Sequence, residues 1–492
     1  MKLIKTIITI TFSALLFCSC DKLKDFGDTN VDPNRTTTPN TAALLTNVLA
    51  SISNRATQTT PGYFCQYFAE TQYPGSSLYT LPQLDFDGIY AGAMYDCQNI
   101  INTNSNPVTA NAAASNGSNN NQIAIARILK TYYYWTVTDA WGDAPYTEAL
   151  TGGQNKFPKY DKQADIYKGL LAELKLAKNQ FDAGQTVKGD VVYGGDAAKW
   201  KKLANSLRML IAIRMSRRFT TAGQFAANEF NDAVSDADGS IETNADNFSI
   251  AYPGGSFNSP WFTLYDSRKD VGQASTFVAL LTNIGDKRQL NSIYGSSQLG
   301  VPYGRDREYM NNTWGAIFSA DQWSRVLAPS LRSAAGIVHI VHAAAVLLSR
   351  AEAKERGWTT NVAEPLSSKT LYENAITASH LQWGLSAADA SSYFATGSSV
   401  AYGMVTQENL NKIALQKYIA LYPDGLQGWC EWRRTGLPAL VPAQDALNSG
   451  GKIPRRFVYG VNDYSTNKAN VLAAASLLTG GDSQDAKIWW DQ

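Results

Sequence analysis

Two stretches of the chain repeat apolar residues with the period of an α-helix, and this pattern constrains the fold most. The first starts at Asp161, a predicted N-cap, and its apolar positions recur every three or four residues: Ile166, Leu170, Leu174, Ala177 and Phe181. The second opens at Gly195-Asp196 and has the same pattern: Trp200, Leu203, Leu207, Leu210, Ile211 and Met215. Each stretch predicts a helix that buries one face, with a turn at Gly194 and Gly195 between them.

Comparable patterns predict further helices along the chain. They cover residues 41–54, 85–101, 122–139, 337–355, 369–382 and 407–422. Two pairs, 161–182 with 196–217 and 337–356 with 369–382, are helix-turn-helix units of near tetratricopeptide size, although they lack that repeat's sequence signature. The sequence therefore predicts a predominantly all-α fold, a tetratricopeptide-like helical repeat scaffold in which each helix buries its apolar stripe against the next.

Long irregular tracts interrupt this pattern. Thirty uncharged residues between Asp96 and Arg127 include two asparagine-rich runs, which predict a surface loop. Residues 240–336 and 384–406 are rich in Gly, Ser, Asn and aromatics but have no helical period. Because loops of this length in a compact domain are usually functional, we expect them to form a loop-rich ligand-binding part.

The charged residues and histidines exclude several classes of protein. The 43 Lys and Arg against 42 Asp and Glu leave a net charge of +1, which argues against a nucleic-acid binder. The sequence contains none of the G-x-S-x-G, Walker, G-x-G-x-x-G or H-E-x-x-H motifs. His339 and His342 lie i, i+3 on the predicted 337–355 helix and could face one metal, but their apolar neighbours favour core packing. We expect no catalytic residue, no metal and no cofactor.

Aromatic residues are plentiful, at 25 Tyr, 18 Phe and 12 Trp. Their rings stack on the apolar faces of sugars, while polar side chains bind the hydroxyls. Most of these rings must be core. Two flank a turn at Pro74-Gly75 and five lie among polar residues of the non-helical tract, and these seven are the predicted ligand-binding residues: Tyr73, Tyr79, Trp261, Tyr265, Tyr303, Trp314 and Trp323.

The N-terminus has the layout of a bacterial lipoprotein signal. Lys2 and Lys5 precede eleven apolar or small residues, 7–17, which are too few to span a bilayer. Ser19 and Cys20 follow, so residues 1–19 are the predicted signal peptide and Cys20 the lipidated residue; the alternative is a plain signal peptide with an incidental cysteine. Residues 20–40 are then a tether and 41–492 a single domain. Lipidation would attach the protein to a membrane. The three cysteines of the predicted domain, Cys65, Cys97 and Cys430, are predicted to be small buried residues.

Several motifs occur in order along the whole chain. They are Phe26 to Asn34 (FGDTNVDPN), Asp139 to Tyr146 (DAWGDAPY), Tyr193 to Asp196 running into Trp200 and Ala204 to Arg208, Ala351 to Ala353 with Arg356 to Trp358, Tyr372 to Ile376, Gln416 to Tyr418, Arg433 to Gly436, and Trp489 to Asp491. Together they resemble SusD/RagB-type outer-membrane lipoproteins, in particular a second SusD-like subfamily. Asp21, Lys22, Lys24 and Asp25 resemble the charged signals that send such lipoproteins to the cell surface.

The resemblance implies a mostly helical fold with four tetratricopeptide-like units and a loop-rich ligand face. It also implies a partner, a SusC-like TonB-dependent β-barrel transporter over which the lipoprotein sits and to which it delivers nutrient oligosaccharides. Peptides are the alternative ligand. The helical motifs are structural in the family, and ligand residues have no motif, so the seven aromatic predictions depend on their chemistry and context alone.

Overall fold

Helices account for about half of the chain, and the computed structural model describes residues 39–314 and 322–492. The prediction of a predominantly α-helical, tetratricopeptide-like fold is confirmed. The long helices are α2 (Thr41–Ala56), α5 (Tyr95–Ser105), α7 (Asn119–Trp141), α8 (Gln163–Gln180), α9 (Ala197–Arg214), α10 (Phe225–Val234), α15 (Ala343–Glu355), α16 (Ser368–Gln382), α18 (Thr406–Leu421) and α19 (Gly425–Thr435). Residues Thr41–Gln492 form one unit.

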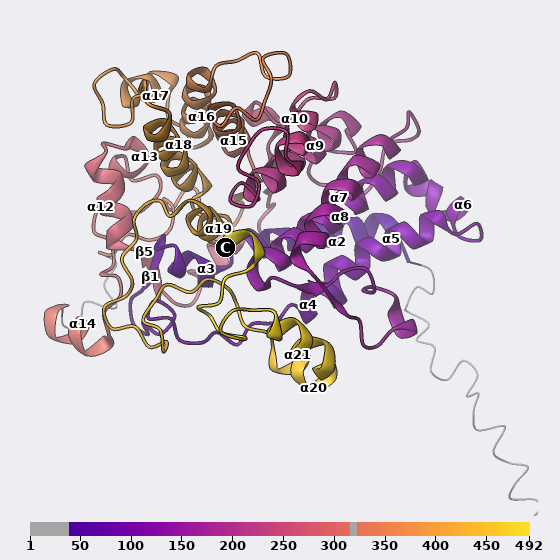
Figure 1. The fold of residues 1–492 in the computed structure, drawn as a ribbon, viewed down its shortest axis with the longest axis horizontal. Helices are drawn as coiled ribbons and strands as arrows, with labels where there is room; N and C mark the ends of the chain where they lie inside the picture. Colours follow the sequence, from indigo (N-terminus) through magenta and orange to yellow (C-terminus); the bar gives the residue numbers. More distant parts are fainter. Residues whose placement is uncertain (1–38, 315–321) are drawn as a thin grey trace, which may run out of the picture. The chain divides into compact units, whose positions relative to one another are not determined.

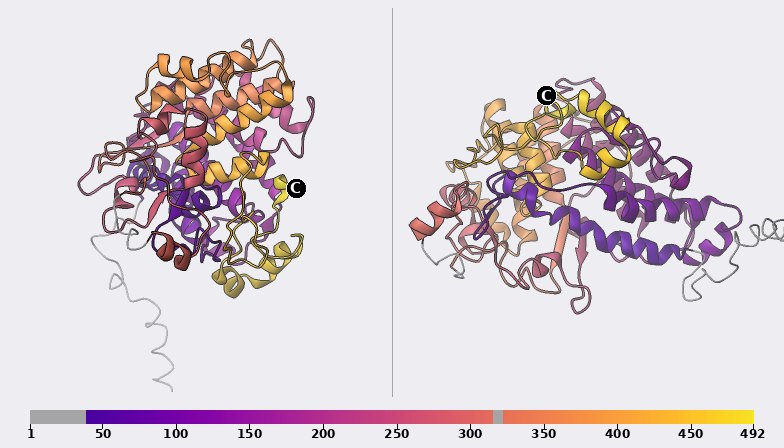
Figure 2. Two further views of the ribbon diagram at one scale, coloured as in Figure 1. Left: turned by 90° about the vertical axis from the view of Figure 1, so that its left-hand side faces the viewer. Right: turned by 90° about the horizontal axis from the view of Figure 1, so that it is seen from below.

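The long helices pack on their neighbours in the sequence. Helix α7 contacts α5 and α8, α9 contacts α8 and α10, and α15 contacts α16 and α18. Figures 1 and 2 show the helices of the first part of the chain, indigo to magenta, in one group and the orange helices α15 to α18 in another. Each helix therefore buries its apolar stripe against the next, as in helical-repeat proteins.

Side-chain caps explain where several helices begin. Asp196 accepts hydrogen bonds from the backbone N–H groups of Ala198 and Lys199 at the start of α9, where the sequence pattern places the beginning of a helix. Asp161 was the predicted cap of the preceding helix, and this prediction is wrong because α8 begins after Lys162. The Asp161 carboxylate instead accepts hydrogen bonds from the backbone of Tyr146 (3.1 Å) and Thr147 (2.8 Å).

Three two-stranded antiparallel sheets join segments that lie far apart in the sequence. Strand β1 (Phe68–Glu70) pairs with β5 (Val271–Gln273), β2 (Ala144–Pro145) with β3 (Tyr160–Asp161), and β4 (Phe248–Ala251) with β6 (Ile337–Val341). The β1–β5 pair matters for the site, because it joins the loop after α3 (Thr59–Phe64) to the irregular tract that is predicted to form the ligand face.

The predicted helix over residues 337–355 is wrong in its first part. Its first five residues form strand β6, and only Ala343–Glu355 is helical. The run Ile-Val-His-Ile-Val is rich in β-branched residues, which favour a strand. His342 is the N-cap of α15, where its Nδ1 accepts a hydrogen bond from the N–H of Ala345 at 3.4 Å. His339 and His342 therefore do not share a helix face.

The tract between Asp96 and Arg127 is largely helical rather than a loop. Helix α5 runs to Ser105, α6 (Ala110–Ala113) follows, and α7 begins at Asn119. Amide side chains form hydrogen bonds with the backbone of this uncharged tract. Asn104 donates to the carbonyl of Ile100 at 2.8 Å, and Gln122 donates to that of Gly117, also at 2.8 Å. A polar, uncharged run can thus satisfy its own backbone.

Short elements also occur in the other two irregular tracts. They are α11 (Pro260–Thr263), α12 (Ser275–Asn283), α13 (Lys287–Leu290), α14 (Arg307–Trp314) and α17 (Ala387–Tyr393). The chain closes with α20 (Val461–Thr466) and α21 (Lys468–Ser476).

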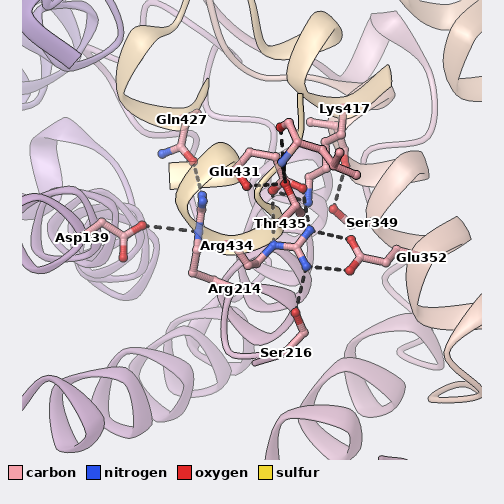
Figure 3. A network of polar contacts seen from close by, with 12 residues as sticks. Asp139, Arg214, Ser216, Ser349, Glu352, Lys417, Gln427, Glu431, Arg434 and Thr435 are labelled. Atoms are coloured by element: carbon pink, nitrogen blue, oxygen red, sulfur yellow. Dashed lines mark hydrogen bonds and ion pairs between the residues drawn. The ribbon is translucent and has the colours of Figure 1, made fainter. Parts of the chain in front are cut away.

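A buried ionic network joins α9, α15, α18 and α19 (Figure 3). The Arg434 guanidinium lies 2.6 Å from Glu352 and 2.5 Å from Glu431, and the Lys417 ammonium lies 3.4 Å from Glu431. Burial lowers the pKa of Lys417 to about 8, against the opposing effect of Glu431. Arg434, Glu352 and Lys417 all belong to motifs recognised in the sequence, so these motifs hold helices together, as the resemblance implied.

Candidate functional site

Tyr73 follows strand β1, and the pairing of β1 with β5 places it beside the residues that precede β5. The ladder continues past β1, where the N–H of Thr71 donates to the carbonyl of Asp270 at 2.7 Å. The guanidinium of Arg268 consequently lies 5.2 Å from the centroid of the Tyr73 ring. Tyr73 remains 51% exposed. The turn after it is held by Glu70, whose carboxylate accepts the N–H of Ser76 at 2.7 Å.

Helix α14 supplies the other side of this surface. Arg307 places its guanidinium 5.4 Å from the Tyr73 ring centroid, and that of Arg305 lies 3.7 Å from the ring centroid of Tyr309. Tyr309 is 38% exposed. We name this surface the Tyr73 patch, made of Tyr73, Arg268, Arg305, Arg307 and Tyr309. At these distances the guanidinium groups interact with the aromatic rings.

Residues of the C-terminal part of the chain hold the segments that carry the patch. The N–H of Asp445 donates to the carbonyl of Gly304 at 3.0 Å, and the Asp445 carboxylate accepts the N–H of Asp306 at 2.9 Å. Two residues on, the N–H of Leu447 donates to the carbonyl of Leu78 at 2.7 Å. Backbone bonds from one segment thus position both the loop that follows Tyr73 and the start of α14.

Ion pairs offset part of the patch's positive charge. Arg268 pairs with Asp270 at 2.6 Å, and Arg305 lies 3.4 Å from Asp445. Within the parts of the chain that the structure describes, exposed Arg307 makes no ion pair. The patch therefore offers exposed rings and guanidinium N–H donors together, which are the groups that bind sugar faces and sugar hydroxyls.

Three of the seven predicted ligand-binding aromatics are buried, which corrects the expectation that they lie on the ligand face: Tyr79, Trp261 and Trp323, at 0%, 3% and 0% exposure. Tyr79 accepts the N–H of Ala443 at 2.9 Å and packs edge-on to Phe64. Trp261 lies edge-on to Phe68. These rings have no exposed face for a ligand, because the C-terminal segment and the aromatic core cover them.

Three others are partly buried and pack against the core: Tyr265, Tyr303 and Trp314. Tyr265 donates to the carbonyl of Val271 at 3.0 Å, and Arg332 lies 4.6 Å from its ring centroid. Tyr303 donates to the carbonyl of Tyr63 at 2.7 Å. Of the seven predicted residues, only Tyr73 is exposed.

Trp314 shares helix α14 with Arg307 and stacks edge-on against buried Trp323, with ring centroids 5.3 Å apart. The structure thus places Trp314 on an element of the patch and Trp323 beneath it. Sequence reasoning missed Arg268, Arg305, Arg307 and Tyr309. One signal in the sequence could have indicated three of them, the run from Arg305 to Tyr309. In this run alternating charges end in an aromatic residue, within a tract that has no helical period.

The histidines lie in packed positions. His339 shares a hydrogen bond with Ser249 at 2.8 Å, and His380 with the carbonyl of Ile376 at 2.9 Å. Burial lowers the pKa of His339 and His380 to about 4 and that of His342 to about 3, so all three are neutral at pH 7. Among the described residues, no group of three His, Cys, Asp or Glu side chains is placed to hold a metal ion.

Stacked helices that carry a loop-built aromatic surface define the class of helical-repeat binding scaffolds. Comparison with protein families makes the class specific: the SusD-like_2 family, described as "Starch-binding associating with outer membrane", matches residues 33–460. The chain belongs to this family. A comparison with curated proteins finds no match.

Solved structures share the fold over most of the chain. A chitin-binding protein is 25% identical, with a TM-score of 0.74 over 92% of this chain and 100% of that chain. A chitin-binding SusD homolog from Flavobacterium johnsoniae is 23% identical, with a TM-score of 0.74 over 92% of this chain and 98% of its own. A SusD homolog from Bacteroides uniformis is 25% identical, with a TM-score of 0.74 over 92% and 100%.

Proposed function

We propose that this protein is a non-catalytic receptor that binds nutrient oligosaccharides at the Tyr73 patch. The observation that carries the proposal is the exposed ring of Tyr73 with two guanidinium groups beside it. The ring supplies a face for stacking on a sugar, and the guanidinium groups supply hydrogen-bond donors for its hydroxyls. Trp314, Tyr303 and Tyr265 lie on adjoining segments and complete the proposed site with partly buried faces. Recognition of this kind needs no titrating group.

Relatives support a glycan as the ligand. The family description names starch, and two of the similar structures are named as chitin-binding. Starch and chitin are both built of linked pyranose rings, so an aromatic platform suits either polymer. We therefore assign oligosaccharides as the ligand class and leave the particular sugar to measurement.

We further propose that the protein delivers its ligand to a SusC-like TonB-dependent barrel in the outer membrane. Support comes from the family's association with the outer membrane and from the motif series. The proposed signal peptide (1–19), the lipidated Cys20 and most of the tether (20–40) lie outside the described residues. Within residues 39–314 and 322–492, no helix is both long and apolar enough to cross a membrane. A lipid on Cys20 would supply the attachment at the cell surface.

Calorimetry on the purified chain tests the ligand class. We expect chitohexaose or maltohexaose to bind, and the affinity to be modest because desolvation of hydroxyls offsets much of the stacking. Absence of binding to any glycan on an array, together with peptide binding that Tyr73→Ala abolishes, would instead establish the alternative, the same scaffold binding peptides rather than glycans at this patch.

Two further measurements address the partner and the absence of catalysis. Affinity capture from outer membranes should recover a barrel with this protein, and its recovery without any barrel would contradict the delivery step. Incubation with the bound glycan should release no shorter products. Turnover that one carboxylate substitution abolishes would show an enzyme instead.

A further inference from the structure

Three cavities follow one another along residues 79–95, beside the C-terminal residues 447–485, and residues 145–160 also line the last of them; we call the three together the groove. Their volumes are about 270, 400 and 290 Å³. Leu81, Val458 and Asp482 line both the first and the second cavity. The second and third meet where Asp85 is followed by Phe86 and Asn462 by Asp463. The groove is separate from the Tyr73 patch, and none of the five patch residues lines it. Both Figure 1 and the view from below in Figure 2 show α14 and α20 apart.

The segment Leu81–Asp85 lines the central cavity with unpaired backbone. Its side chains alternate between exposed and partly buried, which is the period of a strand. None of its backbone N–H or C=O groups forms a hydrogen bond with any residue in the described parts of the chain. Pro82 has no backbone N–H, but Leu81, Gln83 and Asp85 each have one. In an extended chain the N–H groups of these alternate residues point to the same edge. Such an open edge is able to pair with an incoming strand.

The groove is strongly acidic. Lys156 is its one cationic lining residue. Six carboxylates line it: Asp85, Asp87, Glu148, Asp463, Asp482 and Asp485. Glu148 pairs with Lys159 at 3.5 Å, and Asp482 pairs with Arg456. The other four make no ion pair with any described residue.

Two of the unpaired carboxylates are partly desolvated. Burial raises the pKa of Asp463 to about 6, although a hydrogen bond from the Tyr160 hydroxyl at 2.8 Å opposes this effect. Burial, helped by neighbouring Asp85, also raises the pKa of Asp87. A cation bound between them would remove this electrostatic cost.

We propose that the groove binds an extended basic peptide by strand addition to Leu81–Asp85. The peptide backbone would satisfy the open row of N–H and C=O groups, and its Lys or Arg side chains would neutralise Asp85 and Asp87. Exposed Leu81 and Val461, which are 46% and 73% accessible, flank the groove and suit apolar residues at alternate positions. A neutral sugar fits this groove less well, because it has no cation to neutralise the carboxylates and no row of peptide groups to pair with Leu81–Asp85.

The first test uses synthetic peptides on the unmodified protein. We expect a capped pentapeptide of alternating Lys and Val to bind in calorimetry and its Glu–Val counterpart not to bind. In strand addition every second amide of the ligand pairs, so N-methylation of one alternate set should weaken binding about tenfold and methylation of the other set should not. Equal binding of the acidic peptide, or no effect of either methylation pattern, would overturn the proposal.

Substitutions and hydrogen exchange locate the peptide. Asp85→Asn with Asp87→Asn should weaken peptide binding about tenfold, while the matched control Asp165→Asn, an exposed carboxylate on α8, should not. Amides of Leu81, Gln83 and Asp85 should exchange more slowly once the peptide is bound. Unchanged exchange in this segment places the peptide elsewhere and refutes the site. Glycan binding and its loss on Tyr73→Ala are scored separately, so failure here leaves the proposed function standing, and the reverse also holds.

Discussion

Arg434 and Glu352 form a bidentate ion pair in the core, with Nη1 2.6 Å from Oε1 and Nη2 2.6 Å from Oε2. Removing one partner of such a pair leaves an uncompensated buried charge. We predict that Glu352→Gln lowers the free energy of unfolding by about 3–5 kcal/mol, because Glu431 is then the one carboxylate left to pair with Arg434 among the described residues. Urea unfolding followed by circular dichroism measures this.

The control for this pair is Glu308→Gln, an exposed position on α14. Its effect should stay within about 0.5 kcal/mol. Replacing both members of the pair with Met should cost less than the sum of the two single changes, because neither charge then remains unpaired. A loss below about 1 kcal/mol for Glu352→Gln would show that the network is not needed for stability.

Tyr73→Ala should weaken glycan binding about tenfold, because it removes the exposed ring of the patch. Tyr73→Phe keeps the ring and should retain most of the affinity. Phe157→Ala removes another exposed ring, 63% accessible, outside the patch and serves as the matched control. Calorimetry with the same oligosaccharide compares the four proteins, and unchanged affinity for Tyr73→Ala would move the site away from this patch.

Cys20→Ala tests the proposed anchor. Without the thiol no acyl chain can be attached, so the protein should leave the membrane fraction and be recovered in soluble form. Ser19→Ala keeps a small residue before the cysteine and should leave attachment intact. Fractionation of cells followed by immunoblotting measures the distribution. Membrane retention of Cys20→Ala at the wild-type level would refute lipidation at this residue.

The helical scaffold was predictable because each helix carries its own periodic signal. Helices α9 and α16 begin within two residues of the predicted positions. The start of the 337–355 run was not predictable in this way, since a short and mostly apolar segment such as Ile337–Val341 satisfies helix and strand patterns alike. Its pairing with β4 decides for a strand.

The site was predictable only in part, because burial of a loop residue depends on distant chain. Tyr73 and Trp323 both have polar neighbours in the sequence, yet one is exposed and the other fully buried. Arg268 reaches Tyr73 through the pairing of β1 with β5, two segments about 200 residues apart, which the backbone hydrogen bond from the N–H of Thr71 to the carbonyl of Asp270 extends. Local composition contains no information on that pairing.

Burial of His342 should make the free energy of unfolding sensitive to acid. Burial, with His339 adding to it, lowers its folded-state pKa to about 3, whereas the unfolded chain titrates near 6.5. Between these values the unfolded chain binds a proton that the folded chain does not, so stability is present above pH 6.5 and falls as the pH is lowered. His342→Asn retains an N-cap acceptor for α15 but cannot titrate.

The wild type should therefore lose about 2 kcal/mol more than His342→Asn between pH 7 and pH 5. Urea unfolding across this range measures the difference between the two proteins. That difference cancels groups common to both, including Asp424, whose pKa burial raises to about 7 and which acts in the opposite direction. Ser367→Asn, a cap change on α16 without a titrating group, is the control. Parallel pH profiles for wild type and His342→Asn would show that this imidazole is protonated equally in both states.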